Sequence, residues 1–528
     1  MRNYEKINAF TFAAIVALGG FVFGLDAAVI SGTIKYITQE FLLNDWEVGF
    51  VVSAPGLGVL PALPLAGYLS NRFGRKKALQ LVALVYLISA VCSTFAPNYA
   101  SLVVARFLGG MAFCSLSLAA MYIGEIAPPK WRGKLVSVNQ INIVIGLLAA
   151  YFINYLIIQA VGSDALWIDS WGMKEQTWRW MLGSEILPAL LWFILLFFIP
   201  ESPSWLVLTN NIEAAKATLK KIYPDNEVDN QIIDMQENLS KTEQNQSIWI
   251  QFKEILGKPM RLTLIIGVTI ALVQQLTGIN AVLFYAPTVF EQLGVGTDAA
   301  FVQAIWVGLT GLLFTVLAIF LIDKIGRRPM VIWGLLWIII SLSICSYGFK
   351  AATYKLSTED VSQLSDIKNK HVLNSLADKE FESDTVFKDK IILLLGEDEA
   401  KIHSSSIIQK AAKLNIGLIL FGILSFIAAF HFSIGPVLWV LFSEIFPISL
   451  RSIAIPSFAF LTSISSYLVQ LFFPWQLANM GVAYIFLSYA LFGLVGLAIL
   501  IKYLPETKNM SIEQIQNVLS KKTNKNVK

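Results

Sequence analysis

The stretch FTFAAIVALGGFVFGLDAAVI, from Phe10 to Ile30, carries one ionisable side chain, Asp26, among its 21 residues. A helix needs about 20 apolar residues to cross the hydrocarbon core of a bilayer. A signal peptide can look similar, but this stretch has no small-residue cleavage site and many comparable runs follow it. We therefore expect it to be the first of several transmembrane helices.

Runs of this kind recur through the chain in two sets of six. The first set is Phe10–Ile30, Val48–Leu69, Ala78–Phe95, Leu102–Ile123, Leu135–Ile158 and Arg179–Ile199. The second set is Leu262–Phe290, Phe301–Ile322, Met330–Phe349, Leu414–Phe442, Ile453–Phe473 and Val482–Leu504. The pattern predicts an all-α membrane protein with twelve transmembrane helices in two six-helix bundles.

The composition supports this class. Of the 528 residues, 56% are hydrophobic and 14% are charged, whereas soluble domains carry about 25% charged residues. The net charge of +4 comes from particular loops, so we expect no nucleic-acid partner. Neither a disulfide framework nor a metal site is expected, because the three cysteines lie in apolar runs without paired spacing: Cys92, Cys114 and Cys345.

Basic residues mark one side of the membrane. They gather in the short loops after the second, fourth and eighth predicted helices and in the C-terminal tail. Lys and Arg accumulate in cytoplasmic loops. We therefore expect both termini to be cytoplasmic. The opposite loops carry acidic residues: Asp45, Glu47, Asp164, Asp169, Glu291 and Asp298.

Two polar stretches interrupt the helical pattern and define the expected domains. One separates the two sets of helices, and the other lies on the external side with a single apolar run too short to span. The expected parts are an N-terminal six-helix bundle at 1–205, a cytoplasmic helical linker at 206–261, a C-terminal six-helix bundle at 262–505, an external insertion in it at about 350–413, and a cytoplasmic tail at 506–528.

The two halves repeat each other. Asn71–Lys76 resembles Asp323–Arg328, and Glu125–Arg132 resembles Glu444–Arg451. The two motifs of the second pair lie further apart in the sequence than the two motifs of the first pair. The difference is close to the length of the external insertion. Internal repeats joined by a long loop are typical of secondary transporters, which hold substrate near the bilayer midplane.

Asp26 lies deep in the first predicted helix, and Arg106 lies well inside the fourth. A charge in hydrocarbon is costly unless it is paired or hydrated, so such residues usually mark a proton or substrate path. A carboxyl that alternates between a partner and a desolvated state can take up and release a proton. The alternative is a static pair that fixes two helices. Glu185, early in the sixth helix, is a second candidate, either as a proton relay or as a structural hydrogen-bonding group.

The seventh predicted helix contains three amides, Gln274, Gln275 and Asn280. On a regular helix Asn280 would point roughly 120–140° away from either glutamine. The amides converge on one ligand only if the helix unwinds near Gly278, which glycine permits. A polyol is then a suitable partner, since buried amides need hydrogen bonds. The alternative is that the amides bond between helices.

Gln140 in the fifth helix and Trp439 in the tenth extend this group. Amides and a flat aromatic face suit a neutral sugar better than an anion. Trp439 follows a Gly-Pro break, which favours a gate over the usual role of membrane tryptophans as interface anchors. His431 lies one turn before the Gly-Pro break and is either a packing residue or a proton carrier.

Acidic and basic residues alternate at the predicted cytoplasmic ends of both halves. We expect them to form pairs that latch the halves when the carrier faces outward and that part when it faces inward. Alternatively they mark topology, although the positive-inside rule needs no glutamate. These gate candidates are Glu125, Arg132, Asp323, Arg327, Glu444 and Arg451.

These residues closely resemble the sugar porter family of the major facilitator superfamily, most of all its bacterial proton-coupled symporters. The resemblance runs nearly end to end and implies the major facilitator fold, with two pseudo-symmetric six-helix bundles. The matching motifs are Gly24–Gly32, Asn71–Lys76, Tyr122–Arg132, Pro200–Pro203, Gln274–Asn280, Gly435–Pro447 and Pro505–Lys508.

The resemblance implies that the protein is a carrier and not an enzyme. Such a carrier imports a neutral monosaccharide together with protons by alternating access. It implies that Asp26, with Arg106, is the proton-coupling site, because facilitative members typically lack an acid at that position. It also implies sugar contact by Gln140, Gln274, Gln275, Asn280 and Trp439, with Phe23 lining the cavity.

Two departures from the family leave the sugar open between a pentose and a hexose. Thr462, Ser463 and Ser466 stand where larger side chains are common, and the external insertion is additional. We expect a monomer in the lipid bilayer that binds a monosaccharide and protons and uses no cofactor. The alternatives are an uncoupled sugar facilitator, a polyol or inositol carrier, and a transport-dead sugar sensor.

Overall fold

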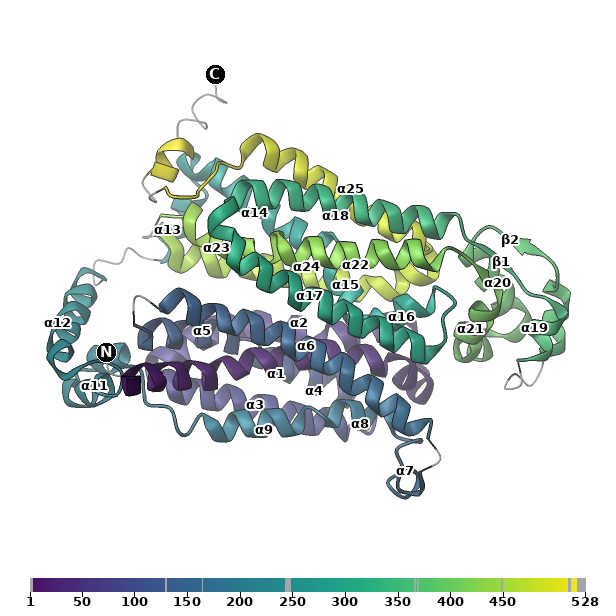
Figure 1. Cartoon of the computed structure of the whole chain (residues 1–528), viewed down its shortest axis with the longest axis horizontal. Coiled ribbons are helices and arrows are strands. Elements are labelled where there is room, and N and C mark those ends of the chain that lie inside the picture. Colours follow the sequence, from purple (N-terminus) through teal and green to yellow (C-terminus); the bar gives the residue numbers. More distant parts are fainter. Residues whose placement is uncertain are drawn as a thin grey trace. The chain divides into compact units, whose positions relative to one another are not determined.

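The structure is a computed structural model in which residues 3–128, 131–163, 165–242, 248–364, 367, 370–447, 450–510 and 514–519 are described (Figure 1). Within these residues, 11 helices are long and apolar enough to cross a membrane. The chain is therefore a multi-pass membrane protein, and the prediction of an all-α membrane fold is confirmed.

The chain divides into two compact units. One comprises residues 1–27, 54–150 and 182–254, and the other comprises residues 28–53, 151–181 and 255–528. The second unit therefore takes one end of the first predicted helix and one end of the fifth, as well as the C-terminal half of the chain.

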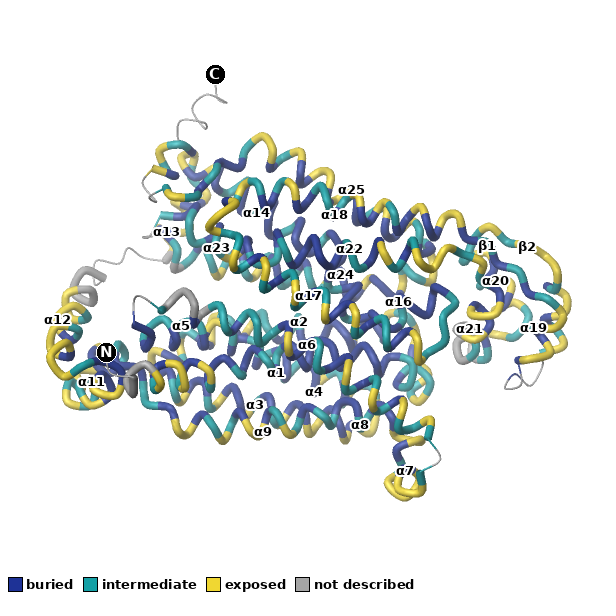
Figure 2. The backbone as a smooth tube through the Cα atoms, in the orientation of Figure 1, coloured by how far each residue is buried: buried dark blue, intermediate teal, exposed yellow. Residues whose placement is uncertain are grey.

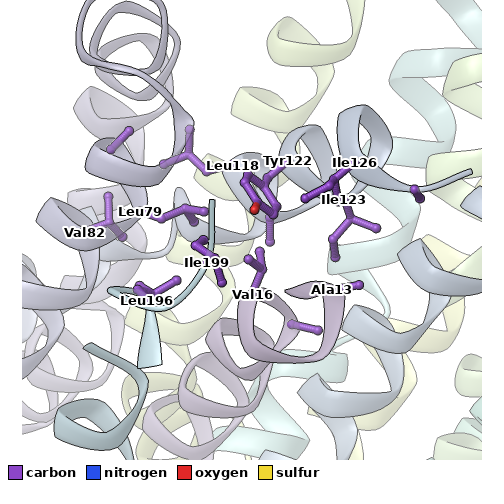
Figure 3. Packing of buried hydrophobic residues seen from close by; sticks show 14 of the residues in the cluster. Ala13, Val16, Leu79, Val82, Leu118, Tyr122, Ile123, Ile126, Leu196 and Ile199 are labelled. Carbon is purple, nitrogen blue, oxygen red and sulfur yellow. The ribbon is translucent and has the colours of Figure 1, made fainter. Parts of the chain in front are cut away.

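The first half of the chain forms thirteen helices among the described residues. Their buried apolar side chains make the core of the first unit, where Val16, Leu79, Tyr122 and Leu196 meet (Figure 3). The helices are α1 (Asn3–Phe41), α2 (Asp45–Phe73), α3 (Arg75–Thr94), α4 (Tyr99–Ala112), α5 (Ser115–Ile126), α6 (Arg132–Val161), α7 (Leu166–Ser170), α8 (Thr177–Gly183), α9 (Ile186–Leu195), α10 (Pro203–Leu208), α11 (Ile212–Leu219), α12 (Asp225–Thr242) and α13 (Ile248–Ile255).

The C-terminal half continues with a second set of long helices. Within it α18 packs against α22 and α25, and α14 packs against α24. The elements outside the insertion are the 3-10 turn η1 (Lys258–Met260), α14 (Arg261–Leu276), α15 (Ile279–Phe284), α16 (Ala286–Glu291), α17 (Thr297–Ile325), α18 (Arg327–Lys350), α22 (Ile416–Phe432), α23 (Ile434–Ile445), α24 (Arg451–Asn479) and α25 (Val482–Tyr503).

The predicted sixth span, Arg179–Ile199, is divided in the structure. A turn at Ser184 and Glu185 separates α8 from α9. Pro188, in the first turn of α9, has no N–H for the carbonyl of Ser184, so the helix lacks one backbone hydrogen bond where the break occurs. The break places Glu185 at a buried helix end, with 5% of its surface exposed.

Glycines bring α1 and α6 into backbone contact in the first unit. A Cβ atom at Gly24 would lie 1.9 Å from the carbonyl oxygen of Ile143, and one at Gly146 would lie 2.1 Å from that of Phe21. Small residues permit such close helix packing in membranes. The contact holds in place the part of α1 that carries Asp26.

Large apolar side chains are also exposed along the helices, as expected for surfaces that face lipid. On α9, Leu187, Leu191 and Ile194 are exposed, and the neighbouring Phe198 is 71% exposed (Figure 2). A lipid-facing exterior therefore explains the small share of charged residues.

The insertion at about 350–413 is a small folded domain with its own core, built around the buried side chains of Tyr354, Leu373, Phe387 and Ile407. Its three short strands are antiparallel in the order β2-β1-β3, and the sequence analysis did not predict them. Its elements are β1 (Thr353–Lys355), α19 (Thr358–Ser362), η2 (Lys370–Leu376), β2 (Glu380–Phe381), α20 (Asp384–Leu395), α21 (Glu397–Ala411) and β3 (Ala412–Lys413).

Candidate functional site

A buried ion pair joins α1 to α4 in the first unit. Arg106 Nη1 contacts Asp26 Oδ1, and the two residues are 2% and 3% exposed. Among the described residues, Asp26 Oδ2 and Arg106 Nε have no hydrogen-bond partner. The predicted pair is therefore present, and part of its hydrogen-bonding capacity is not used by the protein around it.

Glu185 and Tyr86 complete this charged cluster. Glu185, at the break between α8 and α9, interacts electrostatically with Asp26 and Arg106. Tyr86 on α3 is also buried, and its hydroxyl has no hydrogen-bond partner among the described residues. The sequence analysis did not predict Tyr86 as part of this cluster, because a tyrosine inside an apolar run does not by itself indicate a charged neighbour.

Gly109 on α4 packs closely against Ser89 and near Asp26. A Cβ atom at Gly109 on α4 would lie 3.7 Å from Asp26 Oδ2 and 2.6 Å from Ser89 Oγ. The hydroxyl of Ser89 donates to the carbonyl of Ala105 at 2.7 Å. The helices that carry Ser89 and Gly109, α3 and α4, pack against each other.

The three amides of the seventh predicted helix form a connected group in the second unit. Gln275 Nε2 donates to Gln274 Oε1 at 3.1 Å, and Asn280 Nδ2 donates to Gln275 Oε1 at 2.9 Å. Asn280 also donates to Ser466 Oγ at 2.6 Å, which accepts a further bond from Gln470 Nε2 at 2.8 Å. The amides thus converge, and they also bond between helices through Ser466.

The break that allows this convergence lies at Gly278, as the sequence predicted. α14 ends at Leu276 and α15 begins at Ile279, with Gly278 in the left-handed region at φ 82°. A Cβ atom at this position would lie 2.2 Å from ring atoms of Tyr489. Only glycine fits both the backbone conformation and the space.

The other candidate sugar ligands are distributed over both units. Gln140 on α6 and Phe23 on α1 are partly buried in the first unit, where the Phe23 ring packs edge-on against Phe113 at 4.5 Å between centroids. Trp439 on α23 is 46% exposed in the second unit and packs edge-on against Phe442. That all of them contact one sugar stays a prediction.

The gate candidate Glu125 belongs to a network of hydrogen bonds and ion pairs in the first unit. Arg75 donates to both carboxylate oxygens of Glu125, from Nη2 to Oε1 at 2.8 Å and from Nε to Oε2 at 3.0 Å and to Oε1 at 3.1 Å, and Ser202 Oγ donates to Glu125 Oε2. Glu201 accepts backbone N–H bonds at 3.0 and 2.8 Å, from the start of α3 and from Ser202. Gly74, at φ 95°, lies against this carboxylate, which a Cβ atom would approach to 2.2 Å.

The second unit repeats the same arrangement. Arg327 Nη2 binds Glu444 Oε1 at 2.9 Å, and Thr507 Oγ1 donates to Glu444 Oε2 at 2.6 Å. Glu506 accepts backbone N–H bonds from Arg327 at 3.1 Å and from Thr507 at 2.9 Å, beside Gly326 at φ 99°. Glu201 and Glu506 were not among the predicted gate residues, although both stand in the Pro-Glu motifs that carried the resemblance.

The remaining gate candidates have different surroundings. Asp323 pairs with Arg327 at 3.0 Å, but its side chain is 80% exposed. Burial lowers the pKa of the Arg451 guanidinium, and the Glu444 carboxylate opposes that shift. The side chain of Arg132 lies outside the described part of the chain. The observed pairs each join residues of one unit, so a latch between halves stays a prediction.

Comparison with known proteins gives matches along nearly the whole chain. A family model described as sugar (and other) transporter matches residues 12–364 and 400–519. The glucose transporter GlcP of Staphylococcus epidermidis is 32% identical over 520 residues, which cover 98% of this chain and 99% of the relative. The D-xylose-proton symporter of Escherichia coli is 31% identical over 556 residues, covering 99% of this chain and 98% of the relative.

Solved structures agree with these matches. The inward open conformation of the xylose transporter XylE from Escherichia coli is similar at 29% identity and a TM-score of 0.73, over 97% of this chain and 99% of the other. The same transporter in a partially occluded inward open conformation gives a TM-score of 0.72. Because XylE is a major facilitator superfamily protein, the predicted fold is confirmed.

Proposed function

Since the chain belongs to the sugar (and other) transporter family, we propose that it imports a neutral monosaccharide, a pentose or a hexose, by proton symport with alternating access. The observation that carries this proposal is the buried Asp26–Arg106 pair with Glu185 beside it. A transporter that only lets sugar diffuse needs no titratable group inside the membrane, and a buried charge is costly to keep.

The amide group supports a sugar as the transported molecule. Gln274, Gln275 and Asn280 offer both donors and acceptors, which match the hydroxyls of a sugar, and Ser466 adds a small polar group. We propose that these amides, with Gln140, Phe23 and Trp439, contact one sugar. The names of the relatives, which mention glucose and D-xylose, support the same class of substrate.

Proton coupling follows from competition for Asp26. While Asp26 is ionised, Arg106 holds α1 against α4. Protonation weakens that attraction and frees α1 to move with bound sugar. Release of sugar and proton on the other side restores the ion pair. Glu185 is in a position to receive or donate the proton, because it interacts with both members of the pair.

The expected topology belongs to this proposal. Both termini face the cytoplasm, the helices α10 to α12 lie on that side, and the insertion faces outward in the plasma membrane. The basic loops that follow the second, fourth and eighth predicted helices support this orientation.

Transport by the purified protein in liposomes tests the function. Under an inward proton gradient, labelled hexoses, pentoses and inositols are offered in turn, with and without a protonophore. A symporter accumulates its sugar only while the gradient lasts. Uptake that the protonophore leaves unchanged indicates a facilitator, and sugar binding by thermal shift without any uptake indicates a sensor.

A further inference from the structure

The helix α13 joins the polar segment between the two halves to the first span of the second half. It ends at Ile255, and the span begins at Lys258. Three Cα–Cα steps reach at most about 11 Å, so the end of α13 cannot be further than that from the start of the span. The helix is therefore confined to the neighbourhood of the membrane surface.

One face of α13 is already buried in the protein. Gln251 and Ile255, which follow each other at i and i+4, are 6% and 4% exposed. Residues at this spacing lie one above the other on a helix. The helix is thus held in place by this face, and its other faces are free to meet something else.

A second apolar stripe of α13 is exposed. Trp249 and Phe252 on α13, and Leu256 in the turn that follows it, stand at i, i+3 and i+7 and are 65%, 38% and 58% exposed. Ile250, on another side of the helix, is 53% exposed. The rings of Trp249 and Phe252 are stacked at 8°, and Lys253 Nζ lies 5.9 Å from the Trp249 ring centroid. Exposed apolar groups at this helical spacing, ordered against one another, are typical of a binding face.

Basic residues border the stripe. Lys253, Lys258 and Arg261 are all exposed, and Glu254 is the one acidic residue from 249 to 261. Lys and Arg near a membrane surface are attracted to anionic headgroups, and tryptophan favours the headgroup level. The charge and the aromatic residues therefore suit the same partner.

We propose that α13 lies flat on the membrane surface at which α14 begins, with Trp249, Phe252 and Leu256 inserted at the level of the headgroups. The partner is a lipid surface carrying anionic headgroups, which Lys253 and Lys258 contact. An amphipathic helix that binds in this way is anchored by apolar burial and by electrostatic attraction together. α13 would then fix the depth of α14, whose last turn carries Gln274 and Gln275.

Spin labels test the position of this helix. The three cysteines are replaced by serine, and a nitroxide is attached at Phe252→Cys in one protein and at Glu254→Cys, on a different side of the same helix, in a matched control. Both proteins are placed in nanodiscs of phosphatidylcholine with phosphatidylglycerol. We expect the label at 252 to be more accessible to oxygen than to a water-soluble nickel complex, and the label at 254 to show the reverse.

Two results would overturn the proposal. A label at 252 that is as accessible to nickel as the control would mean that the stripe faces water. A label at 252 shielded from both reagents would mean that protein covers it. A second measurement needs no cysteine replacement: brominated phosphatidylglycerol should quench the native protein more than Trp249→Phe, and equal quenching would again reject the lipid contact.

The charge contribution is measured separately. Lys253→Gln with Lys258→Gln should reduce the oxygen preference at 252 in nanodiscs with phosphatidylglycerol and leave it unchanged in pure phosphatidylcholine. An identical loss in both lipids would reject the anionic partner. These outcomes do not depend on which sugar is carried or on proton coupling.

Discussion

The carboxylate of Asp26 is held inside the protein by a single arginine, so its charge decides whether α1 and α4 attract each other. Asp26→Asn removes that charge and mimics the protonated acid permanently. We expect this variant to bind sugar and to exchange it across the membrane, but to lose accumulation against a gradient and sugar-driven proton uptake. Counterflow in liposomes measures exchange, and an imposed pH gradient measures accumulation.

Glu185→Gln is the informative comparison, because Glu185 shares the cluster without an ion pair among the described residues. It should reduce the rate of coupled uptake and keep the final accumulation. Should Asp26→Asn liposomes still concentrate sugar, the coupling role would pass to Glu185 or to His431, whose ring lies 3.0 Å from Thr315 Oγ1.

A second prediction about individual residues concerns Gln274 and Gln275 of α14. Replacing Gln274 and Gln275 by alanine removes the amides on which Asn280 depends. Each lost bond to a buried partner costs about 1–3 kcal/mol, which is roughly 5- to 150-fold in affinity. Isothermal calorimetry measures the loss, and Gln292→Ala, a buried amide outside this group, is the control. Unchanged binding in the double variant would place the sugar elsewhere.

Single residues were predictable where their chemistry is out of place in a membrane. Asp26 and Arg106 stand out in apolar runs, and so do the glutamines of α14. Tyr86 was missed because a tyrosine is unremarkable by composition. Its role depends on which charged groups α3 packs against, and only tertiary structure determines that.

The broken helix α14–α15 depends on one backbone angle. Gly278→Ala would force a side chain into a left-handed conformation, at roughly 1–2 kcal/mol, and against the Tyr489 ring. We expect a lower thermal unfolding temperature together with weaker sugar binding. Gly124→Ala on α5 is the control, since a Cβ atom there meets nothing within 4 Å. Equal effects of both substitutions would contradict the prediction that position 278 requires glycine.

The start of α19 gives a pH-dependent prediction for the insertion. Hydrogen bonds from the Ser357 side chain and backbone lower the pKa of Asp360. The ionised carboxylate therefore stabilises the folded state above the ordinary aspartate pKa, and this contribution is lost as the pH falls through the lowered value. Ser357→Ala should cost about 1 kcal/mol at neutral pH and less in acid.

Hydrogen exchange of residues 353–364 at both pH values measures this difference. Thr358→Ala, a change at the adjacent and exposed first position of α19, is the control. A variant that exchanges like the native protein at neutral pH would contradict the prediction.

The long helices were predictable from their runs of apolar residues. The points at which these helices break were harder to predict. The runs of apolar residues gave the positions of the long helices, and glycine indicated the break at Gly278. The division of the sixth span was missed because Pro188 alone does not show whether a membrane helix bends or stops. The strands of the insertion have two or three residues each and depend on pairing between distant segments.

At the scale of the whole molecule, the networks around Glu125 and Glu444 recur in both halves, and their role as gates stays a prediction. Arg327→Ala would leave the Glu444 carboxylate without its guanidinium partner at 2.9 Å. We expect the balance between the two states to shift toward the inward-facing one. A reporter cysteine at Ser463, in a protein without other cysteines, should react faster with reagent added from the cytoplasmic side. Arg75→Ala should act in the same direction, because its network is equivalent.

Arg261→Ala, an exposed arginine at the start of α14, is the control for charge alone. If Arg327→Ala and Arg261→Ala change the accessibility of the reporter by the same amount, the gate residues act only as topology signals.

The duplicated plan could be predicted from the sequence because the motifs recur in the same order in both halves. The partners of Glu125 and Glu444 could not. Arg132 and Arg451 are the nearest arginines that follow them in the chain, whereas the observed ion pairs go to Arg75 and Arg327 at the start of other helices. Proximity along a chain says little about proximity between packed helices.

The insertion enters and leaves the second unit at one point, because Thr353 on β1 pairs with Lys413 on β3. A domain attached in this way is portable: it could be acquired, lost or exchanged between lineages without altering the spacing between α18 and α22. For the same reason the Thr353–Lys413 junction is a suitable position for a fusion partner or a rigid marker for electron cryo-microscopy, attached to the carrier without cutting a transmembrane helix.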